Sequence, residues 1–208
     1  MEIQSLEDLD ISKILKTARK NSKEFDFKPL AEEIMNKICI SNGAYIYHPI
    51  EIEFYVYDKE KHADIHVYPR EAEAGDIFFH LSGMDICFES SFEEKNGTIS
   101  FGGILIRALE REDGKRFGGP LTCKDEVLNS ANARCVTKMC EKELSYGISN
   151  TKQRKGINKY EKKKDDYWDV KYRFFRDDFI DFLMMEDETF DFDEGHKKPR
   201  KRKYKIED

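Results

Sequence analysis

A carboxylate and an aromatic ring follow each other closely along one strand-like stretch, in a spacing that could support chemistry. Residues 50–57, IEIEFYVY, alternate apolar side chains with acidic or tyrosine side chains. This alternation predicts a β-strand that turns one face to the core, with Ile50, Ile52, Phe54 and Val56 on that face. The other face sets Glu53 about 6.5–7 Å from Tyr55 along the strand, where a carboxylate beside a ring could activate water against a flat substrate. The alternative is a half-buried strand that shows its acids and tyrosines to solvent.

A second charged residue interrupts an apolar strand. Residues 102–109, GGILIRAL, are apolar on both faces except for Arg107, as expected of a central strand. An unpaired buried charge costs several kcal/mol, so this arginine should face a carboxylate. The alternative is an arginine at the end of its strand, with its head group in water.

Three further polar groups invite a chemical interpretation. His80, Ser82 and Asp85 could form a catalytic triad, but no nucleophile elbow surrounds Ser82, so we favour His80 as a residue that lines a pocket. His62 and His66 are four residues apart and could hold a metal if they were helical. No third ligand stands at a characteristic spacing, which favours a solvated loop and a protein without metal or cofactor.

The elements that must position these residues mix helices and strands. The sequence predicts helices over 5–23 and 29–38, a hairpin turn at Asn42-Gly43, a polar loop over 58–73, and strands within 75–88 and 102–109. Gly83 is expected to bend its strand, and helices and loops are expected after Pro120. This order predicts an α+β fold, a single domain around a strongly curved, mostly antiparallel sheet.

Length and charge distribution set the domain boundaries. The 208 residues are 39% hydrophobic and 38% charged, with a net charge of −6. We expect one domain over 1–185, with residues 1–28 as an N-terminal helical segment, and a disordered tail over 186–208. The tail is first acidic and then basic, so it could grip phosphates, address the protein to a compartment, or only keep it soluble. Its basic residues include Lys197, Lys198, Arg200, Lys201, Arg202 and Lys203.

Cysteine usage points to a reducing compartment. The five cysteines form no C-x-x-C pair and leave one unpaired, which argues against a disulfide framework and against a structural zinc site. The N-terminal residues carry no basic segment followed by an apolar one, and no apolar run approaches the ~18 residues of a membrane span. We therefore expect a cytoplasmic protein, monomeric and without a membrane partner.

Several of these segments, in order along the chain, resemble motifs of the alkyladenine (3-methyladenine) DNA glycosylase family. The resemblance covers roughly residues 30–176, and "LIRALE" is its most specific part. In the first half of the chain, LAEEIMNK (30–37) resembles the family's "LA-x-x-LLGK", IEIEFY (50–55) resembles "IVE-x-EAY", and GDIFF…GMDIC (75–87) resembles "G-x-LYVY-x-x-YGM-x-x-C". In the second half, ILIRALE (104–110) resembles "VLIRALEP", RKGI (154–157) resembles "R-x-GI", and KYRFF (171–175) resembles "P-x-RFYV".

The resemblance implies a fold and a chemistry. The fold would be that of the alkyladenine DNA glycosylases, which is formyltransferase C-terminal-like. Glu53 would be the general base that activates water for attack on the C1′ carbon, and Arg107 would help to hold that water. Tyr55 would stack on a flipped-out base, and Phe79 stands where the family has a second ring. The family's pocket histidine falls near His62 and His66.

The sequence also departs from the family pattern where that family handles duplex DNA. Ser82 stands where the family has the tyrosine that it wedges into the duplex, and Glu89 stands where a gating asparagine belongs. The family's "TPRN" loop is missing or shortened. We therefore expect an N-glycosidase-like protein that excises or binds a modified purine-type base, in DNA or as a nucleoside-like ligand. The alternative is a non-catalytic module on the same fold that binds nucleic acid or a partner.

Overall fold

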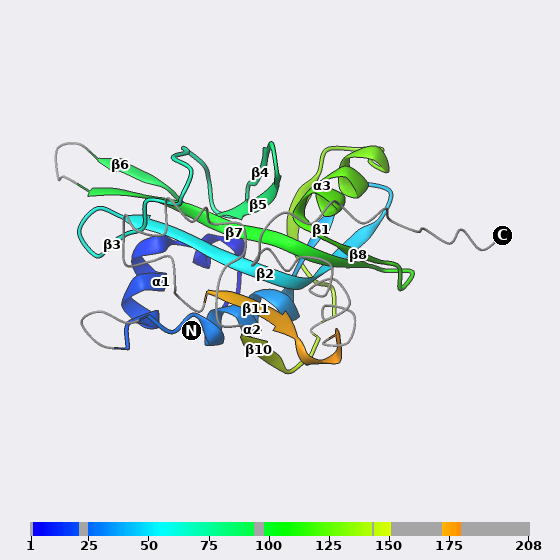
Figure 1. Cartoon of the computed structure of the whole chain (residues 1–208), viewed down its shortest axis with the longest axis horizontal. Helices are drawn as coiled ribbons and strands as arrows, with labels where there is room; N and C mark the ends of the chain where they lie inside the picture. The colour runs from blue at the N-terminus through cyan, green and yellow to red at the C-terminus, as the bar shows by residue number, and fades with distance from the viewer. Residues whose placement is uncertain (1, 21–24, 94–97, 143, 151–171, 180–208) are drawn as a thin grey trace, which may run out of the picture.

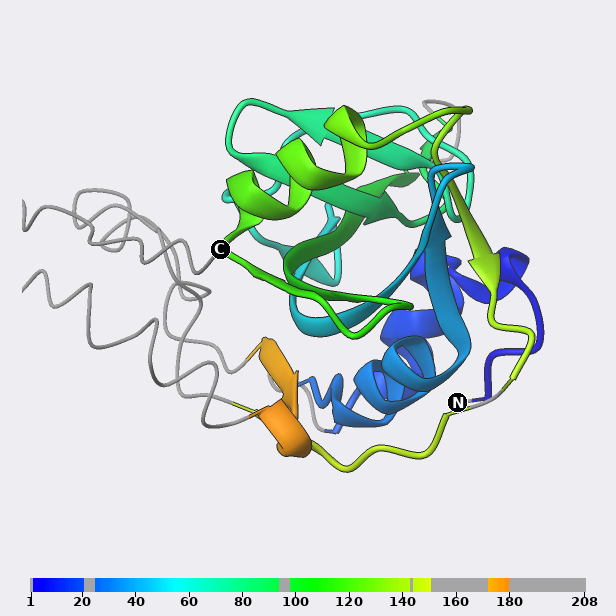
Figure 2. The same cartoon turned by 90° about the vertical axis from the view of Figure 1, so that its right-hand side faces the viewer.

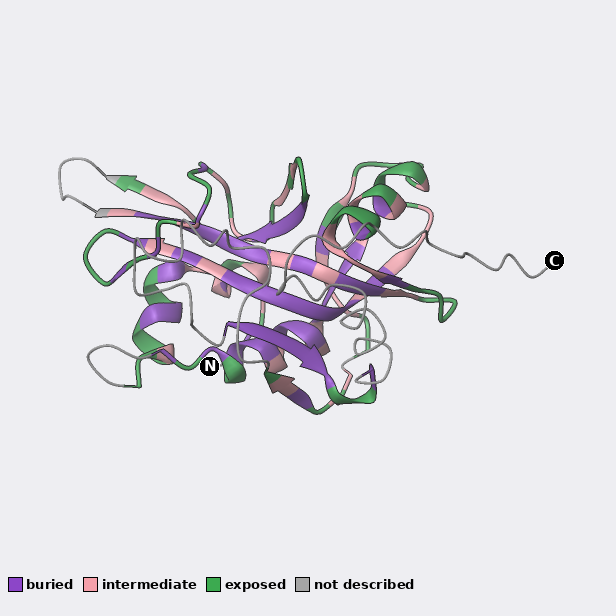
Figure 3. Ribbon diagram, viewed as in Figure 1, coloured by how far each residue is buried: buried purple, intermediate pink, exposed green. Residues whose placement is uncertain are grey.

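Two long antiparallel strands form the centre of the protein. β2 (Ile46–Asp58) pairs with β7 (Thr98–Arg111) along almost its whole length, and both are buried through most of their central part (Figure 3). The computed structural model describes residues 2–20, 25–93, 98–142, 144–150 and 172–179. The strand predicted around Glu53 and the central strand predicted around Arg107 are therefore neighbours.

The other strands extend this pair into one curled antiparallel sheet. The order along its main path is β10-β11-β2-β7-β5-β4, and β1 joins β2 to β9. Figure 1 labels most of the strands, and Figure 2, turned by 90°, shows the sheet curling into a half-barrel. The fold is thus a single α+β domain around a curved antiparallel sheet, as predicted. The remaining strands are β1 (Ile38–Ser41), β3 (His62–Ala63), β4 (Ile77–His80), β5 (Gly83–Cys87), β6 (Ser91–Glu93), β8 (Arg116–Gly118), β9 (Val136–Met139), β10 (Ile148–Asn150) and β11 (Arg173–Arg176).

The N-terminal segment is divided where a single helix was predicted. A 3-10 turn, η1 (Leu6–Asp8), precedes α1 (Ile11–Ala18). Asp10 separates them because its side chain accepts hydrogen bonds from the backbone amides of Ser12 and Lys13 and so caps α1. The predicted helix over 5–23 is therefore wrong in extent, and its second half starts at a cap that the apolar pattern did not reveal.

The second helix agrees with its prediction. α2 (Lys28–Lys37) has Pro29 in its first turn, where the missing amide hydrogen costs nothing. Leu30 and Ile34 are buried on its inner side. The ring of Phe27, just before α2, stacks on Phe54 of β2 at 5.1 Å. α1 and α2 therefore cover the sheet face that carries Phe54, which leaves Glu53 on the opposite face.

The structure after β2 differs from the prediction at β3 and at Gly83, and it agrees with the helix and loops predicted after Pro120. The segment predicted as a loop over 58–73 contains β3, a two-residue strand that pairs with the end of β2. Leu81 and Ser82 form a tight turn between β4 and β5, so Gly83 starts a strand rather than bending one. α3 (Pro120–Asn129) packs against β5, β7 and β8. A second 3-10 turn, η3 (Asp177–Phe179), follows β11.

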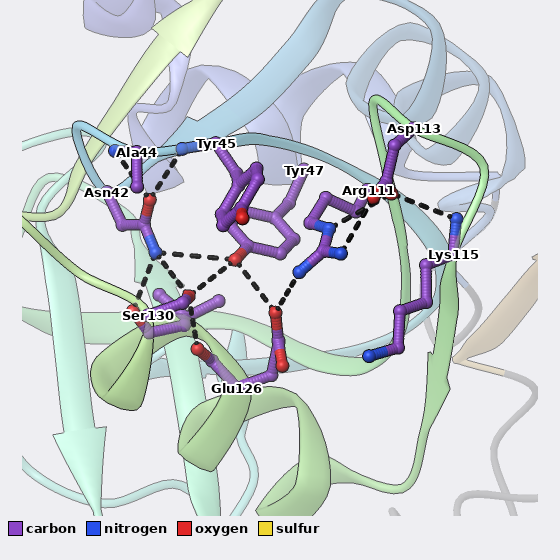
Figure 4. A network of polar contacts seen from close by, with 10 residues as sticks. Asn42, Ala44, Tyr45, Tyr47, Arg111, Asp113, Lys115, Glu126 and Ser130 are labelled. Atoms are coloured by element: carbon purple, nitrogen blue, oxygen red, sulfur yellow. Dashed lines mark hydrogen bonds and ion pairs between the residues drawn. The ribbon is translucent and has the colours of Figure 1, made fainter. Parts of the chain in front are cut away.

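The predicted hairpin at Asn42-Gly43 is present, and a buried asparagine anchors it to α3. Asn42 is fully buried. Its Oδ1 accepts hydrogen bonds from the amides of Ala44 and Tyr45, and its Nδ2 donates to the Val127 carbonyl (2.9 Å) and to Ser130 Oγ (2.8 Å). Figure 4 shows this network. One amide thus joins the hairpin turn to the end of α3.

The Tyr47 hydroxyl extends this network toward the edge of β7. It bonds to Ser130 Oγ at 2.8 Å and to Glu126 Oε1 at 3.2 Å (Figure 4). Arg111 Nη1 donates to the same Glu126 oxygen at 2.8 Å. Nε and Nη2 of Arg111 donate to the two carboxylate oxygens of Asp113. Burial and the negative charge of Glu126 raise the pKa of Tyr47, so this hydroxyl remains a donor at neutral pH.

We expect Asn42→Ala to lower the free energy of unfolding by roughly 1–3 kcal/mol, because it leaves buried backbone groups without partners. Urea denaturation followed by circular dichroism measures this. Asn129→Ala, on the exposed end of α3, is the matched control and should change stability by less than about 0.5 kcal/mol. Equal effects of the two variants would show that the network does not anchor the hairpin.

None of the helices in the described ranges is both long enough and apolar enough to cross a bilayer.

Candidate functional site

Glu53 occupies the centre of the sheet, on the face away from α1 and α2. The register pairs it with Leu105 of β7 on one side and with Arg173 of β11 on the other. Its side chain is 0% exposed. A carboxylate in such a place needs partners of opposite charge, because desolvation of an unpaired ion is expensive.

Two arginines supply that charge. Arg107 Nη1 lies 3.4 Å from Glu53 Oε1, and Arg107 Nε lies 3.3 Å from Glu51 Oε1. Arg173 Nε contacts Glu51 Oε1 and lies 3.8 Å from Glu53 Oε1. We call Glu51, Glu53, Arg107 and Arg173 the charge cluster. It holds two negative and two positive groups, so it is neutral as a whole.

The charge of Arg107 is fixed by its partners. Burial by itself lowers the pKa of the Arg107 guanidinium, but the neighbouring carboxylates of Glu53 and Glu51 outweigh burial and raise it. The guanidinium therefore stays charged, as arginine does in proteins. The sequence predicted that Arg107 would face a carboxylate, and the structure confirms this contact.

Tyr55 completes the surroundings of Glu53. Its hydroxyl donates a hydrogen bond to Glu53 Oε2 at 3.0 Å, and its ring is half-buried on the same face. Glu53 thus lies beside an aromatic ring and a guanidinium group, the kinds of neighbours that can position a general base.

A β-bulge sets the position of Arg107 and corrects the prediction for Ile50. The pairing between β2 and β7 shifts twice, and it skips Ile50 on β2 and Arg107 on β7. Ile50 is buried as predicted, but it belongs to a separate apolar cluster and not to the main core. That cluster contains Ile50, Ala108, Phe175 and Phe179. An extra residue at a bulge changes the face that its neighbours occupy, and strict alternation could not show this.

His80 and Ser82 lie on the same side of the sheet as Glu53. Asp85 pairs with Leu105, which pairs with Glu53, so the three side chains stand in one row across β5, β7 and β2. His80 Nε2 is 3.3 Å from Asp85 Oδ1, and its Nδ1 is 3.2 Å from Ser82 Oγ. The structure thus brings together His80, Ser82 and Asp85, which the sequence analysis considered as a catalytic triad.

Phe79 does not face this site, which corrects its predicted placement. It pairs with Met84, a fully buried core residue, whereas Phe78 pairs with Asp85. Because neighbouring residues of a strand point to opposite faces, Phe78 lies on the Glu53 face and Phe79 on the other. The Phe78 ring stacks on the His80 ring, with the two ring centroids 6.1 Å apart. Phe79 instead lines a cavity of about 580 Å³.

His62 is a core residue rather than a pocket residue. Its Nδ1 is 2.8 Å from the Val56 carbonyl, and its Nε2 is 2.9 Å from the Tyr172 hydroxyl. Its ring meets the edge of Phe25 within the main core. Both nitrogens are used, so His62 cannot join His66 in a metal site. His66 is half-buried, and its backbone amide donates to Asp64 Oδ1.

Sequence reasoning missed two members of the site. Alternation places Glu51 on the same face as Glu53 in the octapeptide, but the sequence analysis did not select it as a site residue. Arg173 stands between Tyr172 and Phe174 in an aromatic strand, and an arginine in such a setting is the same signal that identified Arg107. The predicted basic tail, from Lys197 to Lys203, lies outside the described residues.

Comparisons with protein-family models, with curated proteins and with solved structures found no match for this chain.

Proposed function

We propose that this protein is an N-glycosidase that releases a modified purine-type base, with Glu53 as the base that activates water. The buried Glu53 carboxylate, 3.4 Å from the Arg107 guanidinium and hydrogen-bonded to Tyr55, is the observation that carries the proposal. A carboxylate held in this way on a rigid strand is pre-positioned for proton abstraction. We also propose that the curled α+β sheet has the fold of the alkyladenine DNA glycosylases.

The chemistry follows from the positions of these groups. Glu53 takes a proton from a water molecule as the water oxygen bonds to C1′. The C1′–N bond breaks, and the base leaves with the electron pair. Arg107 holds the carboxylate in its orientation, and Tyr55 offers a half-buried ring beside it, on which a flat base can stack. The substrate is a base in DNA or a nucleoside-like molecule, and the protein acts as a cytoplasmic monomer.

A base-release assay tests this proposal. Single- and double-stranded DNA and RNA, each carrying one modified purine, are incubated with the full chain, and the free base is measured by mass spectrometry. We expect release of at least one base by the wild type and none above background by Glu53→Gln. Release that is equal in both proteins would refute the role of Glu53.

One observation favours the non-catalytic alternative, a nucleic-acid- or partner-binding module. Both oxygens of Glu53 already have partners within the protein, Arg107 at Oε1 and Tyr55 at Oε2, as in a purely structural ion pair. A protein that binds the modified oligonucleotides but releases no base from any of them would support this alternative.

We expect base release to prefer single-stranded over paired substrates by roughly 10- to 100-fold. Flipping a base from an intact duplex costs a few kcal/mol, and Ser82 is too small to fill the gap that the base leaves. Single-turnover rates on matched single- and double-stranded oligonucleotides measure the preference, and Ser82→Tyr should narrow it. Equal rates for the wild type would mean that another side chain acts as the wedge. Leu81, which is 93% exposed at the tip of the same turn, is the nearest large candidate.

A further inference from the structure

Ser82, His80 and Asp85 form a second chemical centre at the β4–β5 turn. Its member on β5, Asp85, is two strands away from Glu53, about 10 Å by strand spacing. The turn stands beside α3 (Figure 1). The contacts run in series: Asp85 Oδ1 to His80 Nε2 at 3.3 Å, and His80 Nδ1 to Ser82 Oγ at 3.2 Å. Exposure increases in the same direction, from the buried Asp85 through the half-buried His80 to the exposed Ser82. The proposed glycosidase uses none of these contacts.

The order of these contacts matches the proton arrangement that a nucleophilic serine needs. The tautomer of His80 that carries its proton on Nε2 donates to the Asp85 carboxylate. In that tautomer, Nδ1 accepts the hydroxyl proton of Ser82. Arg70 Nη1 donates to the other Asp85 oxygen and locks the orientation of the carboxylate. This is the order nucleophile, base and orienting acid.

Lys124 supplies a cation at the same turn. Lys124 of α3 donates hydrogen bonds to the backbone carbonyls of His80 (3.0 Å) and Leu81 (2.9 Å). An ammonium group has three donors, and these two bonds leave one for a substrate oxygen next to Ser82. The same two bonds hold the turn rigidly against α3.

The surroundings of Ser82 indicate the substrate class. Leu81 is 93% exposed and Tyr68 is 59% exposed, and the Tyr68 ring lies 5.7 Å from the His80 ring. These two side chains offer apolar contact area beside the polar centre. They suit the hydrocarbon part of a small ester better than a charged group.

We propose that Ser82 is the nucleophile of a serine esterase centre that acts on small apolar esters. Ser82 Oγ bonds to the ester carbonyl carbon as its proton passes to His80 Nδ1, and the carbonyl oxygen takes the negative charge beside Lys124. The C–O bond to the alcohol breaks, and the alcohol leaves with the proton from His80. Water then attacks the acyl-serine by the same route, so that ester and water give acid and alcohol.

A fluorophosphonate probe tests this with the full-length protein. An activated serine displaces fluoride and forms a stable O–P bond, which peptide mass spectrometry locates. We expect the adduct on Ser82 in the wild type, and labelling at least 100-fold slower in His80→Gln, since a general base contributes about 10²–10⁴-fold. Hydrolysis of p-nitrophenyl butyrate should fall by a similar factor in Ser82→Ala and by about 100-fold in Lys124→Met.

One control tests whether the effect is specific to Ser82. Ser90→Ala removes a serine whose hydroxyl bonds to the Ala72 backbone, and it should hydrolyse the ester like the wild type. Ester hydrolysis does not involve Glu53, and base release does not involve Ser82 as a nucleophile, so the two proposals can fail independently. No adduct at Ser82, or labelling that His80→Gln leaves unchanged, overturns the proposal.

Discussion

Glu53→Gln should lower the single-turnover rate of base release by about 10²–10⁴-fold, the range that a positioned general base contributes. Glutamine keeps the shape of the side chain and can still contact Tyr55, but it cannot accept a proton from water. Binding of the same modified oligonucleotide, measured by fluorescence anisotropy, should change by less than about threefold. A loss of rate without a loss of affinity is the signature of a group that acts in the chemical step.

Glu51→Gln is the matched control for this variant. Glu51 is buried on the same face of β2 and contacts the same two arginines, so its replacement disturbs the charge cluster to a similar degree. Glu53 in addition accepts a hydrogen bond from Tyr55. We expect Glu51→Gln to slow base release by no more than about tenfold. Equal rates for the two variants would mean that the charge cluster supports the fold and that Glu53 has no special role.

Arg173→Met should lower the free energy of unfolding by about 3 kcal/mol, because the removal of one partner leaves a buried carboxylate short of compensating charge. Breaking a buried pair costs about 3–5 kcal/mol, and we expect the lower end because Arg107 remains 3.3 Å from Glu51. Urea denaturation monitored by circular dichroism gives the difference. Arg134→Met, at an exposed position, should change stability by less than about 0.5 kcal/mol.

The double variant Arg173→Met with Glu51→Gln separates charge from packing. If the destabilisation comes from the uncompensated carboxylate, neutralising Glu51 should recover part of the loss. The double variant would then be more stable than the sum of the two single changes predicts. Strict additivity would instead assign the effect to the packing of the Arg173 side chain.

The pattern of side chains along the sequence was sufficient to predict the central strands and the faces of most of their residues. Alternation placed Ile52, Phe54 and Val56 in the core and Glu53 with Tyr55 on the other face, because successive side chains of a strand point to opposite sides. The isolated charge of Arg107 predicted a carboxylate partner, since the cost of an unpaired buried ion does not depend on the fold. These inferences use only local geometry and local energetics.

Pairing between distant segments decided the rest. β11 brings Arg173 next to Glu53 across 120 positions of sequence, and no local rule contains that contact. The register of β4 against β5 put Phe78, and not Phe79, on the Glu53 face, and the bulge at Ile50 moved that residue out of the main core. His62 looked like a pocket or metal residue because its partners, Val56 and Tyr172, come together only in the folded core.

For the trio at the β4–β5 turn too, the sequence determined some features and the tertiary structure decided others. The order His80, Ser82, Asp85 is visible in the sequence, but whether His80 reaches both of the others depends on a two-residue turn and on the strand pairing that follows it. The residue types were set by the sequence. Their mutual distances depend on the backbone hydrogen bonds of the sheet, which form between strands and become fixed only when the whole sheet has folded.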